Sequence, residues 1–307
     1  MRVVFMGTPE FAVAPLSALA GRHDVLAVYT QPDRPRGRGR RLTPSPVKEL
    51  ARQLELPVRQ PETLKDPDVV SQLRQLQPDI VCVAAYGLIV PGEVLAVPTH
   101  GCVNVHASLL PRHRGAAPVH RAILEGDSVT GVVVMRMEEG LDTGPFTHAV
   151  RVPVDEHDVA SLTAILAEKG ATALVETLDE IEAGIVSWTD QNDADATYAH
   201  KVGAADVALE PAIEAETALR RVRASTPSAR SRACVHGVPL EVLAAQHTDR
   251  QVASGRAYTD KHSLVLGFLD GALRLERVKP AGKAEMDAAA YARGAHIPPD
   301  AFWERCP

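Results

Sequence analysis

Cysteine is scarce in this chain, and its placement excludes the common cysteine-based sites. The 307 residues contain four cysteines, Cys82, Cys102, Cys234 and Cys306. None of them forms a C-x-x-C pair, and none has the spacing to a histidine that a structural zinc site requires. Cys82 and Cys102 lie within apolar, strand-like runs, so we expect buried thiols in a reducing compartment rather than disulfides.

A long apolar run is also missing. No stretch is long enough to span a bilayer, and neither a secretory h-region nor a transit-like leader precedes the strand-like sequence that starts at Arg2. Hydrophobic residues make up 45% of the chain and charged residues 23%, as in ordinary globular proteins, and 307 residues suffice for two domains. We expect a cytoplasmic protein of bacterial type, and we also expect a monomer.

A net excess of positive charge is absent, since 39 acidic residues outnumber 33 basic ones and the formal net charge is −6. Any contact with nucleic acid must therefore come from a local basic patch. Residues 31–46, the arginine loop, form such a patch, because arginines alternate with proline and glycine there. Arginine binds phosphates through paired hydrogen bonds and stacks on bases, so we expect this loop to order on RNA rather than remain solvated surface. Its arginines are Arg34, Arg36, Arg38, Arg40 and Arg41.

The glycine-rich dinucleotide signature G-x-G-x-x-G is absent where it would be expected. The first apolar strand runs into a helix with only Gly7 at the turn, Thr8 as a possible cap and Pro9 in the first helical turn. This pattern disfavours a nicotinamide site, although a helix start can still hold an anion. A plain strand-to-helix turn is the alternative interpretation.

Strand and helix patterns alternate through the first half of the chain. Apolar, strand-like runs include Arg2–Met6, Asp24–Thr30, Asp79–Ala85 and Gly101–His106, and helical segments lie between them. Such alternation predicts an α/β domain with a parallel or mixed, doubly wound sheet.

The pattern changes at a polar, acidic stretch that begins near residue 190. Beyond it the chain has short β-like runs separated by Gly and Asp turns, which predicts a small β-barrel. We expect a first domain over residues 1–189, a linker over residues 190–206 and the barrel domain over residues 207–307.

Asn104 and His106 form the most informative pair in the sequence. Side chains alternate along a strand, so Val103 and Val105 share one face while Asn104 and His106 share the other. A fully buried parallel strand should be apolar throughout, and ligands of open α/β sheets bind at the carboxyl ends of strands. An amide can donate to a developing oxyanion and an imidazole can move a proton, so this pair suits the stabilisation of a tetrahedral intermediate. A turn asparagine beside a hydrogen-bonded histidine is the alternative.

Three further segments carry candidates. The turn Gly140–Gly144 presents Asp142, whose carboxylate could hold an imidazolium or accept a proton through water, or could simply make an Asx-turn. The loop after Ala85 leaves a strand at its carboxyl end and could line the same crevice as Asn104. In the linker, Tyr198 and Lys201 could stack on and pair with RNA, the alternative being a packed hinge.

Together these motifs resemble the folate-dependent formyltransferases, and most closely the branch that acts on methionyl-tRNA. The resemblance implies a Rossmann-like catalytic domain followed by an OB-like β-barrel that helps to hold tRNA. The matching segments are Phe5–Ala12, Gln31–Val47, Asn104–Gly115, Val129–Gly144, Thr197–Lys201 and Lys279–Lys283. The chain departs from the family pattern at His113, His200, Val207–Glu210 and Ser225–Arg232.

The resemblance also assigns roles to single residues. Asn104, His106 and Asp142 fall on the family's catalytic Asn, His and Asp. The implied tRNA contacts are the arginines of the arginine loop, with Tyr198 and Lys201. The implied folate-binding residues are Ser108, Leu109, Leu110 and Pro111, together with Leu88, Ile89 and Val90.

The activity that the resemblance implies is formyl transfer from 10-formyltetrahydrofolate to the α-amino group of methionyl initiator tRNA. No metal is expected, because the formyl amide is already activated and the site supplies hydrogen-bond donors. Rival interpretations are a formyltransferase for glycinamide ribonucleotide or a nucleotide-sugar amine, and a formyl-folate hydrolase. An RNA-binding module with a decayed enzyme domain is a fourth, against which the intact Asn104, His106 and Asp142 argue.

Overall fold

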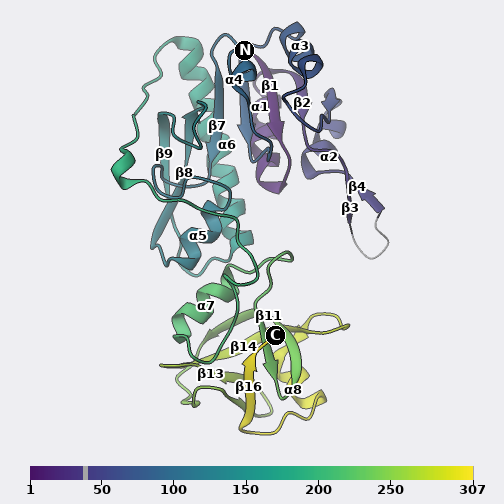
Figure 1. Cartoon of the computed structure of the whole chain (residues 1–307), viewed down its shortest axis with the longest axis vertical. Helices are drawn as coiled ribbons and strands as arrows, with labels where there is room; N and C mark the ends of the chain where they lie inside the picture. The colour runs from purple at the N-terminus through teal and green to yellow at the C-terminus, as the bar shows by residue number, and fades with distance from the viewer. Residues whose placement is uncertain (37–40, 307) are drawn as a thin grey trace. The chain divides into compact units, whose positions relative to one another are not determined.

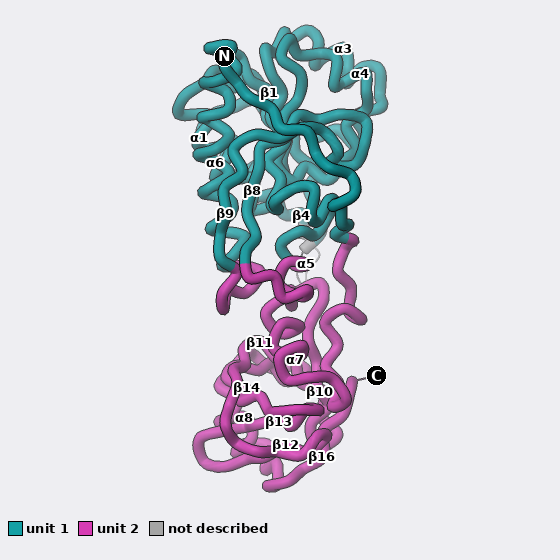
Figure 2. Tube along the Cα trace, turned by 90° about the vertical axis from the view of Figure 1, so that its left-hand side faces the viewer, with its two compact units in different colours: residues 1–119, 129–153, 161–199 teal, residues 120–128, 154–160, 200–307 magenta. Residues whose placement is uncertain are grey.

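The protein, described here by a computed structural model, is defined over residues 1–36 and 41–306. It divides into two compact units, coloured separately in Figure 2. Unit 1 comprises residues 1–119, 129–153 and 161–199, and unit 2 comprises residues 120–128, 154–160 and 200–307. The two units are groups of residues in mutual contact and not continuous segments of the chain. They therefore do not test the expected domain boundaries at residues 189 and 207, which stay predictions.

A seven-stranded sheet forms the centre of unit 1 (Figure 1), with the order β5-β2-β1-β6-β7-β8-β9. Neighbours from β5 to β7 pair in parallel, whereas β8 pairs antiparallel with β7 and β9 pairs antiparallel with β8. The predicted Rossmann-like sheet is confirmed, in its mixed form. The strands are β1 (Arg2–Gly7), β2 (Asp24–Tyr29), β5 (Val58–Arg59), β6 (Ile80–Ala84), β7 (Cys102–His106), β8 (Val129–Arg136) and β9 (Phe146–Pro153).

The helices of unit 1 begin where the sequence supplies capping residues. Ser45 accepts a hydrogen bond from the backbone N–H of Lys48 at the start of α2, and Asp66 accepts one from Asp68 at the start of α3. A proline occupies the first turn of both helices, where its missing N–H has no intrahelical partner to lose. The helical elements of unit 1 are η1 (Glu10–Ala12), α1 (Val13–Ala20), α2 (Pro46–Gln53), α3 (Pro67–Gln75), α4 (Gly92–Leu95) and, apart from its first two residues, α6 (Val159–Ala183). Helix α5 (Pro118–Leu124) lies mostly in unit 2.

A glycine in α6 sets how closely that helix packs on β7. A Cβ atom at Gly170 would lie only 2.6 Å from Cγ1 of Val105, so the helix backbone approaches the strand more closely than an alanine would allow. Val105 therefore faces α6. Since side chains alternate along the strand, Asn104 and His106 lie on the opposite face of β7, away from this helix.

The arginine loop has more regular structure than its composition suggests. Strands β3 (Arg34–Arg36) and β4 (Arg41–Thr43) pair antiparallel and project from unit 1 (Figure 1), where the sequence predicts only a loop. The sequence pattern does not predict this strand pairing, because the segment is rich in proline and glycine and lacks alternating apolar side chains. Backbone hydrogen bonds hold the two strands together. Arg38 and Arg40 lie outside the described residues, as do the side chains of Arg36 and Arg41.

The base of this hairpin is held by a buried lysine. Nζ of Lys48 donates to Oδ2 of Asp33 and to Oε1 of Gln60, each at 2.6 Å. Gln60 in turn donates from Nε2 to the other oxygen of Asp33 at 2.8 Å. A buried ammonium needs such partners, and here they connect α2 to the first residues of the arginine loop.

Unit 2 is built around a closed antiparallel barrel, which confirms the predicted OB-like domain. The strand order is β11-β10-β16-β12-β13-β14-β15, and an additional pairing between β11 and β14 closes the barrel. In its core Phe268 meets the edge of Trp303 at a centroid distance of 4.9 Å, and the indole N–H donates to the backbone carbonyl of Gly267. The strands are β10 (Arg232–Val235), β11 (Val238–His247), β12 (Arg256–Thr259), β13 (Leu264–Gly267), β14 (Ala272–Pro280), β15 (Met286–Asp287) and β16 (Ala301–Arg305).

Several short elements escape the sequence analysis. In unit 1 these are β5 and α4, and in unit 2 they are β12, β15, β16 and helix α8 (Ala288–Gly294). Each is too short for its apolar spacing to distinguish a strand from a helix or a loop. The remaining elements are η2 (Asp193–Asp195) and α7 (Ala215–Arg223). In the part of the chain that is described, no helix is both long and apolar enough to cross a bilayer.

Candidate functional site

Strand β7 presents Asn104 and His106 on one face, as the alternation of the sequence predicts. Asn104 is partly exposed, and its side-chain amide has no hydrogen-bond partner among the described residues. His106 is 5% exposed. One polar group with free hydrogen-bonding capacity thus stands beside an almost fully enclosed imidazole.

Both ring nitrogens of His106 have defined surroundings. Nε2 lies 3.0 Å from the backbone oxygen of His113. A carbonyl oxygen can only accept, so this contact places a proton on Nε2. Nδ1 lies 3.6 Å from Oδ2 of Asp142. When Nδ1 also carries a proton, an imidazolium therefore faces a carboxylate.

Asp142 reaches this position from the loop, residues 137–145, that joins β8 to β9. Its backbone adopts a φ of 53°, a left-handed conformation that few residues other than glycine adopt readily. At the end of the turn a Cβ on Gly144 would lie 2.0 Å from the carbonyl oxygen of Arg136, so only glycine fits. Oδ2 of Asp142 also accepts a hydrogen bond from the backbone N–H of Gly115 at 2.8 Å. The carboxylate is therefore fixed between two loops.

This arrangement can perform acid–base and oxyanion chemistry. Asn104 offers an amide donor, His106 an imidazole that can carry charge, and Asp142 a carboxylate that stabilises that charge. Residues distant in the sequence supply the pieces, since Asp142 belongs to the β8–β9 turn and the other two to β7.

Two of the four expected folate-binding residues after β7, Ser108 and Leu110, are buried in the protein. Ser108 is fully buried and donates from Oγ to the backbone oxygen of Arg112 at 2.6 Å. Leu110 packs with Val133, Met135 and Phe146. A ligand at this loop would therefore meet its backbone, Pro111 and the half-buried Leu109 more than these enclosed side chains.

The neighbouring loop, between β6 and α4, exposes an apolar side chain. Ile89 is 78% exposed, whereas Leu88 and Val90 pack partly against the core cluster that contains Tyr86. An isoleucine side chain that is exposed to this extent offers apolar surface to a ligand.

The predicted RNA contacts are exposed where the structure describes them. Arg34 is exposed and donates to Oε1 of Gln31 at 2.6 Å. Tyr198 is 51% exposed, and Lys201 is exposed as well. Gln31 accepts this hydrogen bond from Arg34 and donates another from Nε2 to the backbone oxygen of Tyr86. These two bonds anchor the arginine loop beside the β6–α4 loop.

Sequence reasoning missed the residues that support Asp142. Arg114 is 2% exposed and bonds to Gln191, whose amide also reaches the turn of Asp142. Gly115 supplies its backbone N–H. The one signal in the sequence is the cluster of polar residues after Thr189, a pattern that predicts a linker.

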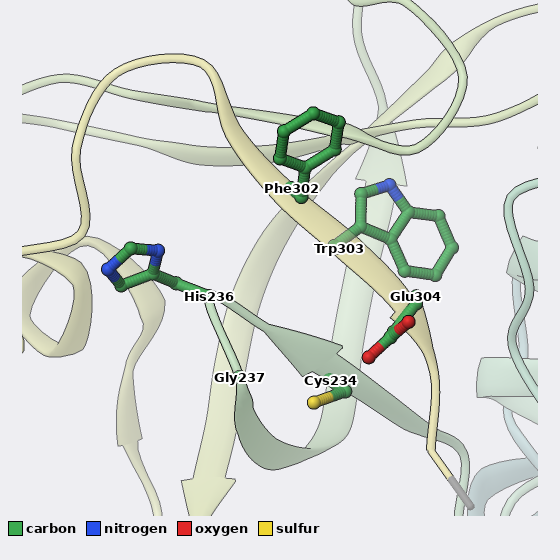
Figure 3. A pocket seen from close by; sticks show the side chains of 6 residues that line it. All are labelled: Cys234, His236, Gly237, Phe302, Trp303 and Glu304. Atoms are coloured by element: carbon green, nitrogen blue, oxygen red, sulfur yellow. The ribbon is translucent and has the colours of Figure 1, made fainter.

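A pocket in unit 2 lies outside all predicted sites (Figure 3). Its volume is about 320 Å³. Burial raises the pKa of the Cys234 thiol, so the thiol is a weak nucleophile there. The pocket lies between β10 and β16 and is lined by Cys234, His236, Gly237, Phe302, Trp303 and Glu304.

Comparison with known families matches both parts of the chain. A family model described as formyl transferase matches residues 1–178, and one described as formyl transferase, C-terminal domain, matches residues 212–296.

Named relatives cover almost the whole chain. A protein of Rhizorhabdus wittichii is 46% identical over 301 residues, which are 97% of this chain and 96% of that protein. A protein of Stenotrophomonas maltophilia is 49% identical over 301 residues, 95% of this chain and 96% of the relative. One of Xanthomonas campestris is 48% identical over 296 residues, with the same coverage. All three bear the name methionyl-tRNA formyltransferase.

Solved structures share the fold at lower identity. HypX from Aquifex aeolicus in complex with tetrahydrofolic acid is 18% identical, with a TM-score of 0.64 over 95% of this chain and 47% of its own. WlaRD, a sugar 3N-formyl transferase, is 13% identical, with a TM-score of 0.63 over 92% of this chain and 99% of its own.

Proposed function

The chain belongs to the formyl transferase family, and from this membership we propose that it transfers a formyl group from 10-formyltetrahydrofolate to the α-amino group of methionyl initiator tRNA. The observation that carries the proposal is the contact of Asp142 with His106, beside the unpartnered amide of Asn104. Folate as the formyl donor is supported by the tetrahydrofolic acid bound to one structural neighbour.

The proposed reaction forms one carbon–nitrogen bond and breaks another. The free α-amine attacks the formyl carbon, a tetrahedral oxyanion forms, and the bond from that carbon to the folate nitrogen then breaks. The amine loses a proton and the departing folate nitrogen gains one. No electrons are exchanged with an oxidant or reductant, so the residues must stabilise one negative charge and move one proton.

Asn104 and His106 divide the stabilisation of the oxyanion. The Asn104 amide is available to donate directly, since it has no other described partner. The Nε2 proton of His106 is shared with the His113 carbonyl, so a protonated His106 acts chiefly through its positive charge. Asp142 stabilises that charge and, through water, helps to carry the proton from the amine towards the folate nitrogen.

The choice of acceptor rests on features beyond these residues. A small-amine formyltransferase has no need for the arginine loop. The barrel does not discriminate, because WlaRD, a sugar 3N-formyl transferase, aligns with 92% of this chain. Relatives that match this chain along its length, barrel included, carry the name methionyl-tRNA formyltransferase. With an aminoacyl-tRNA as acceptor, the cytoplasm is the proposed site of the reaction.

The test is a choice of acceptors offered to the purified protein with 10-formyltetrahydrofolate. The acceptors are methionyl initiator tRNA, glycinamide ribonucleotide, an amino-sugar nucleotide and water alone, followed by mass spectrometry of the products. Formyl-methionine on tRNA is the expected product. Formylation of a small amine instead, or release of formate without an acceptor, would overturn the proposal.

A further inference from the structure

Gln191 has a side-chain amide whose hydrogen bonds are all formed inside unit 1. Its Nε2 donates to the backbone oxygens of Asp142 at 2.8 Å and Gly144 at 2.6 Å. Its Oε1 accepts from Nε of Arg114 at 2.9 Å and from Nη2 of the same arginine at 2.8 Å. An amide has two N–H donors and an oxygen with two lone pairs, so its capacity is used in full.

The surroundings of Gln191 admit only one orientation of this amide. A guanidinium can only donate, and backbone carbonyls can only accept. A flipped amide would place its oxygen against the carbonyls of Asp142 and Gly144 and its NH₂ group against Arg114. Only a side chain with a donor and an acceptor on one rigid group can connect these two neighbours, and Glu or Met of similar length cannot.

The backbone that Gln191 holds is the turn that carries Asp142. The left-handed φ of 53° at Asp142 is unfavourable for a residue other than glycine, so surrounding contacts must stabilise it. Bonds to the carbonyls of residues 142 and 144 restrain the turn on both sides of Thr143. The position of the Asp142 carboxylate relative to His106 therefore depends on them.

The same segment also holds the other support of this carboxylate. Arg114 donates its backbone N–H to the oxygen of Thr197 at 2.8 Å, and its own oxygen accepts from the N–H of Ala199 at 2.7 Å. The next residue, Gly115, donates its N–H to Asp142. Residues 191–199 thus restrain both the turn of Asp142 and the loop whose N–H binds its carboxylate.

We propose that Gln191 is a positioning residue for the transfer, which holds Asp142 at its distance from His106 by bonding the Asp142 turn to Arg114. The inference rests on the proposed function, because it presumes that Asp142 serves the reaction. In this proposal Gln191 acts through Asp142 and Arg114, which take up all its hydrogen bonds, rather than on the substrate. Its loss should impair turnover and leave the binding of both substrates almost intact.

The test variant is Gln191→Glu. It keeps the length of the side chain and its acceptors for Arg114, but it replaces the two donors with an oxygen that repels the carbonyls of Asp142 and Gly144. A misplacement of about 1 Å costs roughly 100-fold in rate, so we expect kcat to fall between about 10-fold and 100-fold. KM for methionyl-tRNA and for 10-formyltetrahydrofolate should change little. The pH–rate profile should change in the same limb as that of Asp142→Asn.

Asp193→Asn is the matched control. Asp193 also contacts Arg114, at 2.7 Å from Nη2, but its side chain is 84% exposed and does not reach the Asp142 turn. Near-normal kcat in this variant separates a role at the turn from a general loss of contacts to Arg114. A fall in kcat equal to that of Gln191→Glu would overturn the assignment to Gln191.

A double variant distinguishes positioning from simple loss of structure. If Gln191 acts through Asp142, Gln191→Glu combined with Asp142→Asn should be no slower than Asp142→Asn alone, because the second change has nothing left to misplace. A double variant that is slower than Asp142→Asn alone, by the factor that Gln191→Glu costs in the wild-type protein, would contradict the inference.

If Gln191→Glu does not fold, Gln191→Met replaces it. Amide exchange at Gly115 should then accelerate while the amides of β1 stay protected, and unchanged exchange at Gly115 would overturn the inference.

The two proposals fail separately. The acceptor is identified with the wild-type protein alone. The role of Gln191 is measured as the ratio of the variant rate to the wild-type rate, with whichever amine accepts the formyl group. A small-amine product would overturn the proposed function. A normal rate and pH profile in Gln191→Glu, beside an impaired Asp142→Asn, would overturn only the role of Gln191.

Discussion

Oδ2 of Asp142 lies 3.6 Å from Nδ1 of His106. The same oxygen accepts the backbone N–H of Gly115, so one carboxylate atom both receives a fixed donor and faces the imidazole. The other ring nitrogen of His106 is committed to the carbonyl of His113. The imidazole is therefore oriented from both sides, which is the condition for a proton and a positive charge to be held at a defined place.

Asn104→Ala should lower turnover by about 10²–10³-fold, the loss typical of one oxyanion donor. The amide has no described partner in the resting protein, so its removal should leave the fold and the binding of folate almost unchanged. Single-turnover rates and equilibrium titration with 10-formyltetrahydrofolate measure the two effects. Near-normal turnover would remove Asn104 from the mechanism.

Asp142→Asn should strongly reduce activity and alter one limb of the pH–rate profile. The amide keeps the shape of the side chain and can still accept from Gly115, but it lacks the charge that favours an imidazolium at His106. The measurement is kcat across the pH range for both proteins. An unchanged profile at the normal rate would mean that Asp142 serves only as a turn residue.

Alanine substitution of the arginine loop should raise KM for methionyl-tRNA and reduce the salt dependence of tRNA binding. Each phosphate neutralised contributes about 0.7–0.9 log units of affinity per log unit of salt. Folate binding should not change, and tRNA affinity measured at several salt concentrations tests the slope. Arg22→Ala, at an exposed arginine paired with Asp179, controls for net charge. An unaltered KM and slope would favour a small-amine acceptor. The substituted residues are Arg34, Arg36, Arg38, Arg40 and Arg41.

Asp33→Asn should destabilise the protein at neutral pH and not at strongly acidic pH. Hydrogen bonds from Lys48 and Gln60 hold the pKa of Asp33 below its ordinary value of 3.8. A pKa lowered by folding means that the carboxylate stabilises the native state above the unfolded value and loses this effect as the pH falls through the folded value. The difference in Tm between the two proteins should therefore be full at neutral pH and shrink below about pH 3.8. A difference that does not change with pH would contradict the ion-pair account.

Gly131→Ala should lower the free energy of unfolding by about 1–3 kcal/mol, as overpacking does. A Cβ at Gly131 would lie 2.3 Å from the backbone oxygen of Val150 and 2.5 Å from Cδ2 of Leu109. Displacement of Leu109 should also weaken folate binding if the loop after β7 holds folate. Urea denaturation measures stability, and Gly21→Ala is the control, because its nearest atom would lie at an ordinary 3.6 Å. Equal stability of both variants would show that β8 and β9 can separate without cost.

The parallel strands and the polar pair of β7, Asn104 and His106, were predictable from local pattern. Buried parallel strands such as β1 and β6 are continuous apolar runs, which the sequence shows directly. The interruption of such a run by Asn104 and His106 marks polar side chains on one face, because strand geometry fixes the alternation. The hairpin in the arginine loop was not predictable, since backbone pairing leaves no mark in side-chain pattern.

The supports of the site were beyond sequence analysis, because they join residues that only the fold brings together. Gln191 and Arg114 are 77 positions apart, and Gln191 and Asp142 are 49 apart. A glutamine among acidic residues belongs to no periodic pattern and no motif, so the sequence predicts only a solvated linker at Gln191. The sequence by itself determined which residues could do chemistry and on which strand face they lie. The tertiary structure alone decided which backbone groups hold Asp142 against His106, since hydrogen bonds need donors and acceptors within about 3 Å and chain order does not record such distances.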